Sequence, residues 1–121
     1  LSILGIISLF LREKPDKSCP ATSSHSVSGN ISDSKDQVYQ VNFPKDSDCL
    51  LEAVFNWKNK ASESSIWVYD PDGKIEVIES NSSGNNSQII KSSPVKEGSW
   101  RIVLKSRSDQ AVNFTGNISL R

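Results

Sequence analysis

The sequence has no methionine, one histidine and two cysteines among its 121 residues. A closed zinc site usually needs four nitrogen or sulfur ligands, so these three side chains exclude a structural zinc. The single histidine, His25, lies in a serine-rich stretch, where we expect no scaffold to hold it beside a nucleophile. The Ser82-Ser83-Gly84 segment lacks the lysine of a phosphate-binding loop. We therefore expect no metal, no cofactor and no catalytic site.

Neither sign of charge is in excess. Lysine plus arginine number 14, as do aspartate plus glutamate, and no long run of one sign interrupts the mixture. Nucleic-acid binders need clustered cations that release counterions, so we expect no nucleic-acid partner. The length suffices for one compact domain and is too short for two.

Hydrophobic runs are scarce, and the one at residues 1–11 differs from the rest of the chain. It is apolar except for two serines and a glycine, and it stops at Arg12-Glu13-Lys14. As a helix it spans about half of a ~30 Å hydrocarbon core, so we interpret it as part of a membrane anchor. A signal peptide is less favoured, because charged residues follow in place of a small-x-small cleavage site. Two alternatives remain open: a buried element, or a strand that docks in a neighbouring sandwich.

Residues 12–34 form a polar, serine-rich segment that contains almost no hydrophobic side chain. Such a composition buries too little surface to order itself, so we expect a stalk or linker. Cys19 lies in this segment and Cys49 lies beyond it. We predict a disulfide between them, closing a loop of about 30 residues and stabilising an exported domain by ~3 kcal/mol.

From residue 35 to residue 121 the hydrophobic pattern has a period of two. Alternation is clear over residues 39–43, 51–57, 100–104 and 114–120, and no hydrophobic stretch has helical spacing. Asp70-Pro71-Asp72-Gly73 has the composition of a tight turn, and we interpret its two carboxylates as turn formers and not as an acid pair. This region therefore predicts an all-β, antiparallel, jelly-roll-like β-sandwich of seven to eight strands.

Five Asn-x-Ser/Thr triplets predict glycosylation and an extracellular location. In Asn113-Phe114-Thr115-Gly116-Asn117 the two asparagines are an even number of residues apart, so an extended strand places both on its solvent face. The predicted sites are Asn30, Asn81, Asn85, Asn113 and Asn117.

Trp67 and Tyr69 have the opposite parity to Ile66 and Val68 in a predicted strand. Exposed aromatic side chains are enriched at contact surfaces and at carbohydrate-stacking sites, so we regard this pair as a candidate contact surface. The alternative is that another layer covers the pair.

The segments Ile66–Gly73, Ser93–Ser106 and Asn113–Leu120 resemble the bacterial and archaeal pre-peptidase C-terminal domain. The resemblance implies a jelly-roll-like β-sandwich of exported proteins, usually attached to a secreted protease or surface protein, that acts in secretion, adhesion or substrate contact without catalysis. Some members bind calcium through aspartates just before the strand that enters the turn. Here Glu63, Ser64 and Ser65 occupy those positions, too few hard ligands for a calcium site.

These observations predict a glycosylated, membrane-tethered surface module of an archaeal cell, with a binding or shielding role. Its expected partner is a protein or a surface polysaccharide. The alternative is a structural subunit of an extracellular filament or membrane complex, a homo-oligomer assembled through residues 1–11.

Overall fold

A computed structural model describes residues 19, 22–44, 49–92 and 96–121. This part of the chain contains strands and one short 3-10 helix, and none of its residues forms an α-helix. The elements in chain order are β1 (Ser23–Ile31), β2 (Gln37–Phe43), β3 (Leu51–Trp57), η2 (Ala61–Glu63), β4 (Ser64–Tyr69), β5 (Ile75–Ser80), β6 (Ser87–Ser92), β7 (Gly98–Ser106) and β8 (Val112–Leu120).

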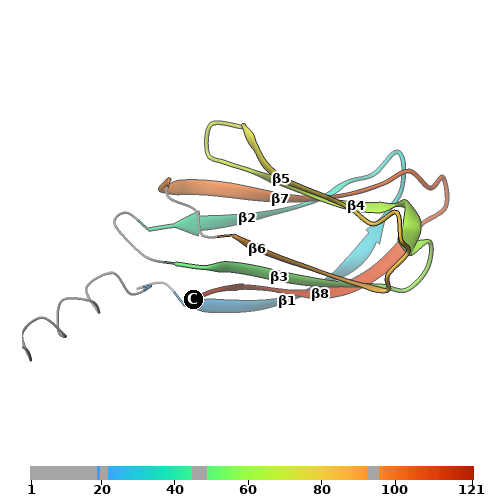
Figure 1. Ribbon diagram of the computed structural model, residues 1–121, viewed down its shortest axis with the longest axis horizontal. Coiled ribbons are helices and arrows are strands. Elements are labelled where there is room, and N and C mark those ends of the chain that lie inside the picture. The colour runs from blue at the N-terminus through green and yellow to red at the C-terminus, as the bar shows by residue number, and fades with distance from the viewer. Residues whose placement is uncertain (1–18, 20–21, 45–48, 93–95) are drawn as a thin grey trace, which may run out of the picture.

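The strands form two antiparallel four-stranded sheets that lie face to face (Figure 1). One sheet has the order β1-β8-β3-β6 and the other has the order β2-β7-β4-β5. Eight strands distributed in this order over two sheets are a jelly roll, which confirms the predicted fold class. Edge strands β1 and β2 lie on one side of the sandwich, and edge strands β5 and β6 lie on the other.

The core lies between the sheets, where alternate residues of each strand point inward. The neighbouring strands β3 and β8 of one sheet supply three buried aromatic rings, those of Phe55, Trp57 and Phe114. Their ring centroids are 5.9–6.2 Å apart. The opposite sheet supplies Trp100 and Ile102, both buried. Trp57 and Trp100 are therefore core residues, as their parity predicts.

The stalk expected at residues 12–34 differs from the structure. Residues 23–31 of that segment form β1, which pairs with β8 along its whole length. The strand has few hydrophobic residues because it is an edge strand, with only Ile31 fully buried and Val27 half-buried. Backbone pairing with β8 orders a segment whose composition alone predicts disorder. The sandwich thus begins at Ser23, and residues 12–18 lie outside the described residues.

The structure contains the predicted disulfide between Cys19 and Cys49, with a Cα–Cα distance of 4.6 Å. Cys49 is buried and precedes β3. Close by, Leu50 and Arg121 exchange two backbone hydrogen bonds of 2.6 and 3.0 Å. Cys19, the start of β3 and the end of β8 are therefore joined at one end of the sandwich.

The Asp70-Pro71-Asp72-Gly73 segment forms the turn between β4 and β5. The Oδ1 atom of Asp70 accepts hydrogen bonds from the backbone N–H groups of Asp72 and Lys74, both at 2.9 Å. Lys96 contacts both aspartates, at 3.4 Å from Asp70 and 2.6 Å from Asp72. The N–H donated by Lys74 lowers the pKa of Asp70, burial opposes this effect, and the N–H of Asp72 and the ammonium group of Lys96 lower the pKa further.

Candidate interaction surfaces

The outer face of the β2-β7-β4-β5 sheet carries two aromatic side chains, each paired with a cation. The Nζ atom of Lys105 lies 4.7 Å from the ring centroid of Trp67, and the Cζ atom of Arg101 lies 5.1 Å from that of Tyr69. We call these four residues the aromatic–cation surface. Cation–π contacts of this kind contribute about 0.5–1 kcal/mol at exposed sites.

Strand register produces these contacts. Tyr69 of β4 is directly opposite Arg101 of β7, and Trp67 is opposite Val103, so Lys105 is the diagonal neighbour of Trp67. The indole Nε1–H of Trp67 donates to the Oγ atom of Ser65 at 3.0 Å. Both rings are half-buried. They are covered by their neighbours on the sheet. Among the described residues, no further layer lies over them.

Hydrophobic side chains continue this surface across the whole sheet. Val38, Val103, Trp67 and Ile78 form one row over four neighbouring strands. Val103 is only 6% exposed although it points outward, whereas Val38 and Ile78 at the ends of the row are 48% and 52% exposed. The row is an apolar stripe on an outer face, and such stripes are typical of contact surfaces.

Strands β2, β4 and β7 carry only cations on this face, whereas edge strand β5 of the same sheet carries Glu76 and Glu79. The outward positions of β2, β4 and β7 include only two charged side chains, Arg101 and Lys105. The Nζ atom of Lys105 also lies 3.9 Å from Asp36, which precedes β2. The surface can therefore receive a partner that presents carboxylates beside apolar side chains.

The outer face of the other sheet is mostly polar, apart from Val54 and Ile89, and carries three of the predicted glycosylation sites. Asn30 of β1 and Asn113 of β8 are directly opposite each other, and Asn117 is further along β8. Asn113 and Asn117 are both exposed, on the solvent face that their spacing predicts. Asn85 is exposed in the connection between β5 and β6. The two outer faces of the sandwich are thus chemically different.

Asn81 does not fit the glycosylation prediction. It is 2% exposed, and its Nδ2 atom donates to the carbonyl oxygens of Ala61 at 2.9 Å and Asn85 at 2.7 Å. Its Oδ1 atom accepts a hydrogen bond from the backbone N–H of Asn85 at 3.2 Å. A glycan on Nδ2 would replace one of the two donating hydrogens and would need space at a buried position, so in this structure Asn81 holds a loop together.

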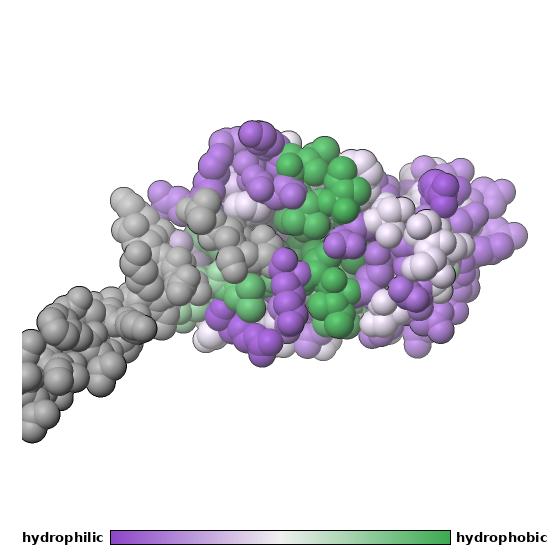
Figure 2. Space-filling model, in the orientation of Figure 1, coloured by the Kyte–Doolittle hydropathy of each residue, from purple (hydrophilic) through white to green (hydrophobic). Residues whose placement is uncertain are grey.

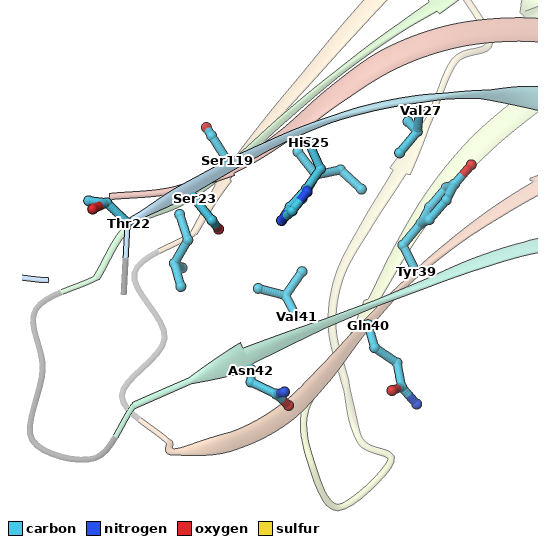
Figure 3. A pocket seen from close by; sticks show the side chains of 11 residues that line it. Thr22, Ser23, His25, Val27, Tyr39, Gln40, Val41, Asn42 and Ser119 are labelled. Carbon is cyan, nitrogen blue, oxygen red and sulfur yellow. The ribbon is translucent and has the colours of Figure 1, made fainter. Parts of the chain in front are cut away.

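A groove opens between the edge strands β1 and β2 (Figure 3). Its volume is about 550 Å³, and His25 and Val27 of β1 lie across it from Tyr39 and Val41 of β2. Burial raises the pKa of Tyr39. The remaining lining residues are uncharged: Thr22, Ser23, Gln40, Asn42, Ile118, Ser119 and Leu120.

Sequence reasoning missed this groove because it placed His25 in a stalk. The alternation of Val27, Gly29 and Ile31 was the available signal for a strand there. The hydroxyls of Ser23 and Ser119 line the groove, and in the described hydrogen bonds no base is oriented toward them.

The described residues contain neither a cluster of metal ligands nor a helix that could span a membrane. No group of three or more His, Cys, Asp or Glu side chains there is arranged to hold a metal ion. Likewise, no helix in that part of the chain has the length and hydropathy needed to cross a membrane. The predicted anchor at residues 1–11 lies outside the described residues.

No family model matches the chain, and no curated protein matches it. Solved structures of other proteins share its fold, including the following three. The Yersinia pseudotuberculosis-derived mitogen superimposes with a TM-score of 0.55 at 11% identity, covering 81% of this chain and 86% of its own. A protein of the disulfide-linked pili of Bacillus endospore appendages superimposes with a TM-score of 0.55 at 5% identity, covering 83% of this chain and 85% of its own. An Aeromonas hydrophila periplasmic inhibitor of g-type lysozyme superimposes with a TM-score of 0.51 at 10% identity, covering 88% of this chain and 90% of its own. At these identities the similarity shows the fold alone.

Proposed function

We propose that this chain is a non-catalytic β-sandwich module of the extracellular cell surface that binds a protein partner through the aromatic–cation surface. Residues 1–11 tether it to the membrane, and glycans on Asn30, Asn113 and Asn117 shield the opposite face. The resemblance to pre-peptidase C-terminal domains agrees with such a role.

An extracellular location is supported by the disulfide, because disulfides persist in oxidising compartments and are rare in the cytosol. The three structural neighbours are a mitogen, a pilus protein and a lysozyme inhibitor. None of these names is that of an enzyme, which agrees with a binding or assembly role.

The observation that carries the proposal is the pairing of each outward ring with a cation. Sugar rings stack on the open face of an aromatic side chain, whereas here Lys105 and Arg101 lie over the rings. A flat surface of Trp, Tyr and Arg with apolar neighbours is typical of the centre of a protein–protein interface. We therefore favour a protein over a polysaccharide as the partner.

Binding to cell envelopes tests this proposal. The full chain is reconstituted in labelled nanodiscs and incubated with envelopes of the cells that produce it, with empty nanodiscs as the blank. We expect binding that survives periodate oxidation of glycans and disappears after protease treatment of the envelopes. Trp67→Ala and Arg101→Ala should each weaken it about tenfold, the size of a hot-spot effect.

Arg121→Ala is the matched control, because Arg121 is also an exposed arginine but pairs with Glu52 away from the aromatic–cation surface. Its binding should equal that of the unmodified chain. Binding lost after periodate and retained after protease would replace the protein partner with a polysaccharide. Equal binding by all variants would show that the partner does not bind at the aromatic–cation surface.

The groove between β1 and β2 favours a second candidate function, a subunit assembled by strand donation. The groove has uncharged lining, and in the described residues no strand pairs with the outer edge of β1 or β2. An uncharged segment such as residues 1–11 of a neighbouring copy matches such a groove. Size-exclusion chromatography with and without residues 1–14 separates the two candidates. Oligomers that need this segment in detergent-free buffer indicate donation, whereas aggregation relieved by detergent indicates an anchor.

A further inference from the structure

The side of the sandwich formed by β5 and β6 exposes hydrophobic side chains. Four large hydrophobic side chains are strongly exposed among the described residues, and three of them are isoleucines of these two strands. Ile75 and Ile78 on β5 are 44% and 52% exposed, and Ile89 on β6 is 58% exposed. Figure 2 shows hydrophobic residues gathered across the middle of this side.

The backbone of this side is also unpaired. In the described part of the chain β5 pairs only with β4, and β6 pairs only with β3. One side-chain bond links the two edges, from the Nε2 atom of Gln88 to the carbonyl oxygen of Glu79 at 3.4 Å. Free edges with exposed β-branched residues are templates for pairing with another strand.

The two edge strands carry opposite charges. Glu76 and Glu79 lie on β5. Lys91 lies on β6, where its Nζ atom is 3.4 Å from Glu52 of β3 and its side chain stays 62% exposed toward the edge. An acidic edge and a basic edge on the same side of one molecule make that side complementary to itself. A second copy of this chain therefore fits the side electrostatically.

We infer that this side is the interface of a homodimer in which β5 of each copy pairs with β6 of the other. Figure 1 shows β5 running toward the connection at residues 81–86 and β6 running back from it. A two-fold axis along the strands therefore places β5 antiparallel to β6 of the partner subunit and extends both sheets. Outward Ile78 then lies next to Ile89 of the partner subunit.

The alternative two-fold axis, perpendicular to the sheets, pairs each strand with its own copy. It brings Glu76 and Glu79 near the partner's Glu76 and Glu79, and like charges on adjacent strands are unfavourable. The axis along the strands has a second advantage, which rests on the proposed tether. It keeps Cys19 of both copies at the same end of the dimer, so that both tethers enter one membrane.

Sedimentation equilibrium of the full chain in density-matched detergent tests the dimer. We expect twice the chain mass of 13.3 kDa, and a dissociation constant that rises about tenfold or more in Ile89→Lys, because a charge replaces a central apolar contact. Val38→Lys is the matched control, since Val38 is similarly exposed on edge strand β2 at the other side. It should dimerise like the unmodified chain.

Charge reversal identifies the pairing. Lys91→Glu alone, or Glu76→Lys combined with Glu79→Lys, should weaken the dimer, and the three changes together should restore it. Pairing of each strand with its own copy predicts no effect from any of these variants and would overturn the inference. A monomer at all concentrations, or a dimer that Ile89→Lys leaves intact, would also overturn it. These outcomes do not depend on envelope binding, so this inference and the proposed function can fail separately.

Discussion

At the residue scale, Asp70 and Asn81 each hold a loop together through hydrogen bonds from their side chains to backbone groups. The turn role of Asp70 followed from its neighbours in the chain, because a turn is made by residues close in sequence. The triplets at Asn81 and Asn85 have equal status in the sequence, but only Asn81 is buried. Its partner Ala61 is 20 residues away, a contact that no local pattern encodes.

Asn81→Ala should lower the free energy of unfolding by about 2 kcal/mol, because it removes the three side-chain hydrogen bonds that join Asn81 to Ala61 and Asn85. Asn85→Ala removes a triplet of the same type, but the Asn85 contacts to Asn81 use its backbone and its side chain is exposed. It should change stability by less than about 0.5 kcal/mol. Urea denaturation of both variants measures the difference. Equal effects would contradict a structural role for Asn81.

Asp70 should make stability depend on acid pH. Its pKa is lowered in the folded state, first by the N–H of Lys74, so the carboxylate stabilises the fold at pH values above its unfolded pKa of about 3.9. That contribution is lost as the pH falls through the lower, folded pKa. Asp70→Asn should show a smaller decrease in melting temperature between pH 5 and pH 2 than the unmodified chain. Parallel pH profiles would exclude this role.

At the element scale, the strands with clear alternation were predicted, and β1 was not. Strands β3, β7 and β8 each bury several large side chains, and these produce the period of two in the sequence. Strand β1 is held in place by backbone hydrogen bonds to β8. Because backbone groups are nearly the same in every sequence, these bonds leave no pattern in the side chains. Edge strands made of polar residues are therefore the elements that are hardest to predict from composition.

Gly116 on β8 should not tolerate a side chain. A Cβ atom there would lie 2.5 Å from the carbonyl oxygen of Val54 and 2.7 Å from Cδ1 of Phe55. Gly116→Ala should lower the free energy of unfolding by about 1–3 kcal/mol, the usual cost of overpacking. At Gly29 on β1 the nearest atoms are 3.5 Å away, an ordinary contact, so Gly29→Ala is the matched control. Thermal unfolding should separate the two variants, and similar melting temperatures would refute the steric argument.

At the scale of the whole molecule, the sandwich class was predictable and the difference between its two faces was not. Strand number and turn spacing set the class. The arrangement of Asn30, Asn113 and Asn117 on one outer face, and of Trp67 and Tyr69 on the other, depends on which strands become neighbours. Strand order arises from long-range pairing, and a single sequence does not specify it locally.

Removal of the disulfide should destabilise the whole domain. Cys19 and Cys49 are separated by 30 residues, so the loop-entropy relation predicts a loss of about 3–4 kcal/mol in the double variant Cys19→Ser with Cys49→Ser. Guanidinium denaturation with and without a reducing agent measures the effect. The reductant should lower the midpoint of the unmodified chain and leave that of the double variant unchanged. Insensitivity of the unmodified chain would contradict the prediction.

The same disulfide determines how the molecule bears mechanical load. A pull on the chain before residue 19 would otherwise peel the weakly buried β1 from β8, one residue pair at a time, from Ser23 onward. The covalent link to Cys49 transmits part of the load to β3, which is held by β6 on one side and β8 on the other. Single-molecule pulling should therefore record a higher rupture force for the oxidised domain than for the reduced one.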